Sequence, residues 1–138
     1  MTHALIVDAV RTPRGKGNDK GSLKAVKPAS LLAQTLVALQ GRTGVDTHHI
    51  SDAIFGCVSQ TGEQGTSVGT LALPLAQWAD SVSAVTINRY CASGLSATNF
   101  AALQSLYGDT LAVGGGVEVM SRVPMGSDQG PLTHDAEL

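Results

Sequence analysis

One cysteine in this sequence stands where a thiol could act as a nucleophile. The stretch NRYCASGL at residues 88–95 places Cys91 between an apolar run typical of a strand and a pattern typical of a helix. A helix N-terminus carries partial positive charge and unpaired N–H groups, which favour the reactive thiolate and can receive charge developing on a carbonyl oxygen. Cys91 is therefore the candidate nucleophile, and the small residues Ala92, Ser93 and Gly94 shape its turn.

A structural role competes with this interpretation, because cysteine is among the most buried residue types. Position alone favours neither role for Cys91. The second cysteine, Cys57, lies within an apolar run with no helix start beside it. We interpret Cys57 as a structural core residue.

The elements that must position Cys91 follow from the hydrophobic pattern. Short apolar runs predict strands at residues 4–10, 53–58, 82–90 and 110–113. Helical patterns cover residues 29–40, 68–78 and 92–107. Alternation of strand and helix is typical of an α/β fold, a parallel sheet covered on both faces by helices.

Individual residues set the expected limits of these helices. Pro28 opens the first helix and Gly41 supplies its stop. Gly69 and Pro74 weaken the second. In the third helix, Gly108 closes a stripe formed by Leu95, Ala102 and Leu106.

Composition excludes several classes of function. The chain has 138 residues, the size of one domain, and its 43% hydrophobic and 14% charged residues oppose disorder. So few charges predict further burial against a missing part of the chain or a partner. A net charge of −2 and few aromatic residues argue against nucleic-acid binding. No apolar run is long enough for a membrane span or a secretory signal, so we expect a cytoplasmic protein.

The densest basic stretch covers residues 11–27. It is either a solvated loop or a loop that meets a phosphorylated ligand or a neighbouring subunit. Four histidines occur in the chain, and we expect each to be a surface or loop residue rather than a base: His3, His48, His49 and His134. The adjacent pair would point to opposite sides of an extended chain, so no metal site is predicted.

Several ordered motifs are similar to those of the thiolases, the acyl-CoA C-acyltransferases. The resemblance covers nearly the whole chain and rests on VDAVRTP at 7–13, GSL at 21–23, IFGCV at 54–58, INRYCASGLSA at 87–97 and GGGVEVMSRVPM at 114–125. It implies the N-terminal βαβαβαβ part of a five-layered α/β/α/β/α thiolase fold, truncated. Residues 1–120 would form a partial N-terminal domain, and residues 121–138 would begin the loop region.

The resemblance also implies a mechanism. The Cys91 thiolate would accept an acyl group from an acyl-CoA thioester and pass it to acetyl-CoA or to free CoA, in a ping-pong order. Fatty acid metabolism, including β-oxidation, is the corresponding setting. Met125 resembles a residue near the substrate pocket of the family. Coenzyme A thioesters would be substrates, with no metal or redox cofactor.

Family members also use a histidine and a second cysteine from C-terminal motifs. Cys57 and the four histidines do not match those motifs, so the chain is expected to lack the complete active site. It would be a fragment, a truncated product or a subunit completed by a separate chain, and homo-oligomers (dimers or tetramers) are expected. The stretch 65–77 departs from the family pattern, which usually has an arginine near Thr70 and a glycine near Gln77.

Other classes fit the residues less well. The loop at residues 11–15 is not the Gly-rich turn of a dinucleotide-binding domain. Arg89 stands where an α/β hydrolase needs a glycine. A β-ketoacyl synthase is the closest chemical rival, and the RYCASG and GGVEVMSR segments favour a thiolase. The non-enzymatic alternative is a thiolase-derived assembly module that binds a partner through sheet edges and apolar helix faces.

Overall fold

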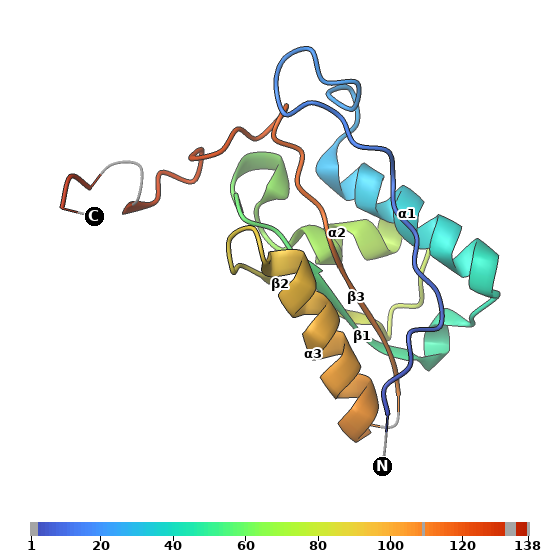
Figure 1. Cartoon of the computed structure of the whole chain (residues 1–138). Coiled ribbons are helices and arrows are strands. Elements are labelled where there is room, and N and C mark those ends of the chain that lie inside the picture. Colours follow the sequence, from blue (N-terminus) through green and yellow to red (C-terminus); the bar gives the residue numbers. More distant parts are fainter. Residues whose placement is uncertain (1–2, 109, 132–134, 138) are drawn as a thin grey trace.

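A computed structural model describes residues 3–108, 110–131 and 135–137 (Figure 1). His134 lies outside these residues. Two 3₁₀ turns, η1 and η2, occur at Thr47–His49 and Gly62–Gln64. The helices and strands are α1 (Pro28–Thr43), β1 (Ile50–Gly56), α2 (Val68–Leu75), β2 (Ser83–Ile87), α3 (Ser93–Gly108) and β3 (Leu111–Gly116).

The three strands form a parallel sheet in the order β2-β1-β3. Gly56, the last residue of β1, pairs with Ile87 of β2 and with Gly116 of β3. The carboxyl ends of all three strands are therefore level. Helices α1 and α2 lie on one face of the sheet and α3 lies on the other (Figure 1). The predicted α/β class, with parallel strands and helices on both faces, is confirmed.

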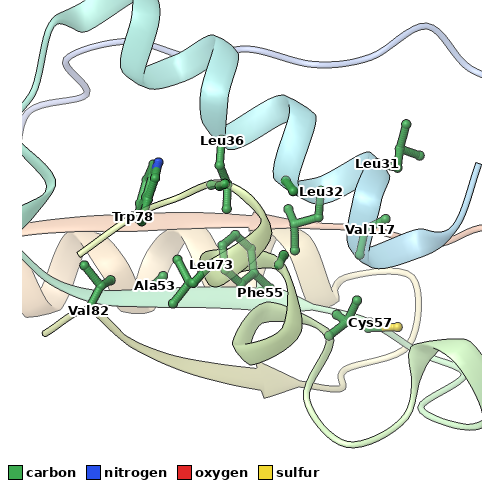
Figure 2. Close-up of a cluster of buried hydrophobic side chains, with 14 of the residues drawn as sticks. Leu31, Leu32, Leu36, Ala53, Phe55, Cys57, Leu73, Trp78, Val82 and Val117 are labelled. Carbon is green, nitrogen blue, oxygen red and sulfur yellow. The ribbon is translucent and has the colours of Figure 1, made fainter. Parts of the chain in front are cut away.

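Side chains of β1 alternate between two apolar clusters. Ala53, Phe55 and Cys57 belong to the larger cluster, which packs between the sheet and helices α1 and α2 (Figure 2). Ile54 points to the opposite face, against Ala97 and Ala101 of α3. This alternation is the two-residue period of a strand that is buried on both faces.

Helix α3 approaches the sheet through small residues, so the predicted stripe of Leu95, Ala102 and Leu106 is wrong. The buried positions of α3 are Ser93, Ser96, Ala97 and Ala101, while Leu95 is 66% exposed. A Cβ atom on Gly114 of β3 would lie 2.5 Å from the Cα atom of Thr98. A leucine would not fit at so close an approach, and Leu95 and Leu103 are exposed instead.

The strand predicted at residues 4–10 is also wrong. This segment has no strand conformation, and Leu5, Ile6 and Val7 are 83%, 81% and 76% exposed. A strand needs a hydrogen-bonded partner, and in the part of the chain that the structure describes the sheet contains β2, β1 and β3 alone. The segment is tied to α1 by an ion pair of 2.9 Å between Asp8 and Arg42.

Two helix ends differ from their predicted positions. Helix α1 continues past Gly41 and ends at Thr43, and the next residue, Gly44, has a φ of 65° and donates its N–H to the carbonyl of Gln40. Gly44 rather than Gly41 is therefore the C-terminal signal. Helix α2 ends at Leu75, and Gln77 follows with a φ of 57°. This left-handed conformation gives a physical reason for a glycine near position 77 in the family pattern.

Candidate active site

The turn that carries Cys91 joins β2 to α3. Strand β2 ends at Ile87 and α3 begins at Ser93, so the exposed Cys91 lies two residues before the helix. Tyr90 has a φ of 47°. This left-handed conformation costs a non-glycine residue roughly 1–2 kcal/mol. Such strain persists only where surrounding contacts impose it.

Ser93 imposes the turn from the helix side. It is 3% exposed, and its Oγ accepts a hydrogen bond of 2.8 Å from the N–H of Arg89. The same hydroxyl donates to the carbonyl of Tyr90 at 2.5 Å. The backbone N–H of Ser93 reaches that carbonyl as well, at 3.0 Å. Ser93 thus closes a loop around Cys91, a more specific role than that of a small residue.

Asn88 imposes the turn from the strand side. Its Oδ1 accepts a hydrogen bond of 2.8 Å from the N–H of Tyr90. Its Nδ2 donates to the carbonyl of Val58 at 3.1 Å. Sequence reasoning missed this residue. The available signal was the tendency of asparagine to bond backbone groups two residues ahead.

The start of α3 rests directly on the end of β1. A Cβ atom on Gly56 would lie 2.4 Å from the N atom of Gly94 and from the carbonyl carbon of Ser93. Only a glycine permits this backbone contact. It places Cys91 at the carboxyl edge of the sheet, where ligands bind in open α/β proteins.

Cys57 follows β1 at the same edge but lies inside the larger apolar cluster, with 1% exposure. Burial, together with the charge of the nearby Glu118 carboxylate and a hydrogen bond to it, raises the pKa of its thiol to about 12. A buried thiol that keeps its proton is a poor nucleophile. The structure therefore agrees with the structural role predicted for Cys57.

Glu118 and Gln64 form a polar network that sequence reasoning also missed. The Glu118 carboxylate accepts hydrogen bonds from the N–H groups of Val58 at 2.7 Å and Ser59 at 3.2 Å. The fully buried Gln64 donates to Glu118 at 2.7 Å and to the carbonyl of Ser59 at 3.0 Å, and accepts from the N–H of Val119 at 2.7 Å. This network links the segments that follow β1 and β3.

The described histidines lie away from Cys91. His48 and His49 are exposed in η1, which precedes β1 and lies at the opposite edge of the sheet. The backbone N–H of His48 lowers the pKa of the Asp46 carboxyl, and the two side chains are 2.9 Å apart. His3 is exposed in the N-terminal segment. Within the described ranges, no three His, Cys, Asp or Glu side chains cluster as metal ligands.

Met125 lies on the surface and is 78% exposed. It belongs to a turn in which the N–H of Ser127 donates to the carbonyl of Pro124 at 3.1 Å. From this turn the chain leads away from the body of the molecule (Figure 1). The place of Met125 near a substrate pocket stays a prediction.

The basic stretch forms a loop beside the end of β3. Arg11, Arg14 and Lys16 line a hollow of about 340 Å³ there, together with residues 116–121. The loop is anchored by Arg122, which donates to the carbonyl of Lys24 at 2.6 Å and forms a two-pronged pair with Glu63. The hydrogen bonds of this pair lower the pKa of Glu63 and raise that of Arg122.

Comparison with known proteins decides the family. The sequence model described as "Thiolase, N-terminal domain" matches residues 4–136. The chain belongs to the thiolase family. Its sequence is 42% identical to a 3-oxoadipyl-CoA/3-oxo-5,6-dehydrosuberyl-CoA thiolase of Escherichia coli (strain K12), over all of this chain and 35% of that protein. It is 46% identical to a beta-ketoadipyl-CoA thiolase of Pseudomonas aeruginosa, over 87% of this chain and 30% of the relative.

A solved structure supports the same assignment of this thiolase-family chain. The acetyl-CoA acetyltransferase of Bacillus anthracis superposes with a TM-score of 0.79 at 35% sequence identity, over 88% of this chain and 30% of the other. The chain spans about a third of the length of the curated relatives that it matches. In the part of the chain that the structure describes, no helix is both long and apolar enough to cross a membrane.

Proposed function

We propose that this thiolase-family chain supplies the nucleophile for acyl transfer between coenzyme A thioesters, with Cys91 as the acyl-accepting residue. The observation that carries the proposal is the exposed thiol on a strained turn at the N-terminus of α3. The names of the relatives support 3-oxoacyl-CoA thioesters as the substrate class.

The first half-reaction forms a thioester on Cys91. In the cleavage direction, its sulfur attacks the 3-oxo carbon of a 3-oxoacyl-CoA, the bond from that carbon to the α carbon breaks, and acetyl-CoA leaves after its α carbon takes up a proton. In the synthetic direction, the sulfur attacks the thioester carbonyl of an acyl-CoA, the carbon–sulfur bond breaks, and coenzyme A leaves. In the second half-reaction, either a CoA thiol or the α carbon of acetyl-CoA takes the acyl group and restores the Cys91 thiol. N–H groups at the start of α3 are suited to stabilise charge on the carbonyl oxygen.

The described residues supply no evident base for these proton transfers. His48 and His49 lie at the far edge of the sheet, and Cys57 is buried and protonated. We therefore propose that a region corresponding to the rest of the relatives' length, on the same polypeptide or on another chain, completes the site. Homo-oligomers, a cytoplasmic location and a pocket role for Met125 belong to the same proposal.

Intact-protein mass after incubation with acetyl-CoA or acetoacetyl-CoA tests Cys91 directly. An acetyl adduct should form on the wild-type chain and on Cys57→Ser, and should be absent from Cys91→Ser. The matched cysteine variant shows that the label needs one particular thiol. An adduct that survives in Cys91→Ser would contradict the role of Cys91. A folded wild-type chain that gains no adduct would show that the completing region is needed already for the first half-reaction.

A second candidate function is that of an assembly module. Large apolar side chains are exposed on α3 and on the N-terminal segment, including Leu103, Tyr107, Leu5 and Ile6. Such a surface is typical of a region that packs against another protein part. Light scattering across a concentration series tests this role: self-association supports it, while a monomer at high concentration counts against it.

A further inference from the structure

A continuous set of hydrogen bonds connects the three strand ends to the Cys91 turn. Glu118, two residues after β3, accepts hydrogen bonds from the N–H groups of Val58 and Ser59, which follow β1. The carbonyl of Val58 accepts a hydrogen bond of 3.1 Å from the Nδ2 of Asn88. The Oδ1 of Asn88 accepts a hydrogen bond of 2.8 Å from the N–H of Tyr90. These contacts, which we call the strand-end brace, span the whole carboxyl edge of the sheet.

Asn88 is the part of the brace that reaches the turn. Its side chain uses one end of the amide as an acceptor and the other as a donor, and the two bonds lie on different segments. An amide combines both roles, whereas a carboxylate only accepts. Asn88 is exposed, so its replacement leaves no cavity in the apolar core. Its effect on the turn can therefore be separated from an effect on the fold.

The geometry at Tyr90 shows what the acceptor oxygen achieves. Tyr90 stands immediately before Cys91 and has a φ of 47°, a conformation that its own side chain disfavours. On one side of the turn the N–H of Tyr90 donates a hydrogen bond to Asn88, and on the other side its carbonyl accepts one from Ser93. Relaxation of φ to the ordinary negative region would rotate the next peptide, and Cys91 with it.

We propose that Asn88 is a positioning residue for Cys91. Its Oδ1 keeps Tyr90 in the left-handed turn that presents the thiol at the start of α3, and its Nδ2 ties this turn to β1 and, through Val58, to Glu118. The part of the proposal that concerns acyl transfer rests on the proposed function. Asn88 acts through the backbone of the turn and is not assigned any contact with substrate.

Two variants that differ by one oxygen atom test the proposal in the full 138-residue chain. Asn88→Ala removes both hydrogen bonds, while Asn88→Ser restores an acceptor that can reach a backbone N–H two residues ahead. Iodoacetamide is the probe at neutral pH, and peptide mass measures the modification of each cysteine. The buried Cys57 reports any opening of the fold in the same sample.

We expect Cys91 in Asn88→Ala to react at least about threefold more slowly, because the thiol leaves the favourable field of the helix terminus. Asn88→Ser should return to within about twofold of the wild-type rate, and Cys57 should stay unmodified throughout. Equal rates in the wild type and Asn88→Ala would overturn the proposal. If Asn88→Ala exposes Cys57, the Asn88→Ser variant decides. Slow modification of Cys91 in Asn88→Ser, with Cys57 protected, overturns the proposal. Modification of Cys91 at the wild-type rate supports it.

Acylation by acetyl-CoA gives the second measurement on the same variants. A displaced nucleophile should acylate about tenfold more slowly in Asn88→Ala, with recovery in Asn88→Ser. If the wild-type chain forms no acyl adduct, acylation of Cys91 by these residues alone fails. The iodoacetamide series still tests Asn88, because that probe needs no coenzyme A site.

Discussion

The two cysteines occupy neighbouring strand ends, yet their surroundings oppose each other. Cys57 follows β1, is 1% exposed, and has Glu118 beside it. Cys91 follows β2, is exposed, and stands before the first turn of α3. One thiol is enclosed by apolar groups and a negative charge, and the other is exposed on the turn that precedes a helix N-terminus. Reactivity thus depends on the segment that follows each strand.

The difference also shows how the segment after Cys57 supports the turn that carries Cys91. The backbone after Cys57 holds Asn88 through the carbonyl of Val58, and Glu118 holds that backbone. The buried region is therefore the rigid support for the exposed turn. Four experiments test this difference between the two cysteines.

The largest effect is expected at the contact between the two regions. Gly56→Ala would place a Cβ atom 2.4 Å from the backbone of Gly94 and Ser93, and neither backbone can yield without moving α3. Overpacking of this kind should lower the free energy of unfolding by about 3 kcal/mol. Urea denaturation measures it. Gly41→Ala, at a helix position with nothing within 4 Å, is the matched control and should not destabilise.

The next effect is a difference in thiol reactivity within the native wild-type chain. Iodoacetamide should modify Cys91 at least about a hundredfold faster than Cys57, because the thiolate of a thiol with a pKa of about 12 is scarce at neutral pH. The single variants Cys57→Ala and Cys91→Ala assign each rate. Comparable rates for the two thiols would mean that Cys57 is not enclosed as described.

A pH dependence of stability should follow from Cys57. An unfolded cysteine titrates near ~8.5, while burial raises the pKa in the folded chain to about 12. The unfolded state therefore releases its proton first as the pH rises. Stability from this group is complete below about pH 8.5 and falls above it by up to ~1.4 kcal/mol per pH unit, until the folded thiol titrates.

Lysine and tyrosine residues titrate in the same range, so the difference between the wild type and Cys57→Ala isolates this contribution. Unfolding free energies at several pH values above 8 should show a steeper decline in the wild type. Parallel curves would show that Cys57 is solvated in the folded state.

The smallest effect is expected for Ser93, which holds the turn from the helix side. Ser93→Ala removes an acceptor for Arg89 and a donor to Tyr90 from a buried position, and should cost about 1 kcal/mol. Thermal or urea unfolding measures the loss. Thr98→Ala removes an exposed hydroxyl bonded within α3, and its change should be smaller. An equal effect of both substitutions would deny Ser93 a special role.

Local signals in the sequence predicted much of this arrangement. The apolar runs and helical patterns located β1, β2, β3 and all three helices to within a few residues, and the strand-to-helix transition marked Cys91. The contacts that hold the turn were hidden for a physical reason. Asn88 and Val58 are 30 residues apart, and Val58 and Glu118 are 60 apart, so the sheet must form before these partners meet.

The wrong predictions share a cause. The leucine stripe of α3 followed hydrophobicity, but the helix approaches Gly114 so closely that small side chains face the sheet. The run at residues 4–10 has the composition of a strand, but strand conformation depends on a neighbour elsewhere in the chain. Both outcomes depend on the surface against which the segment lies, and a local sequence pattern does not describe that surface.

The level strand ends have a consequence for which changes in length this chain can accept. Gly56 pairs with both Ile87 and Gly116, so Val58, Asn88 and Glu118 meet only in this alignment. One residue inserted within β1 would shift its end by about 3.3 Å and turn every later side chain to the other face. Loops at the opposite edge, such as residues 43–46, carry no such constraint. Insertions and deletions among related sequences should therefore occur at that edge and be rare at the edge that carries Cys91.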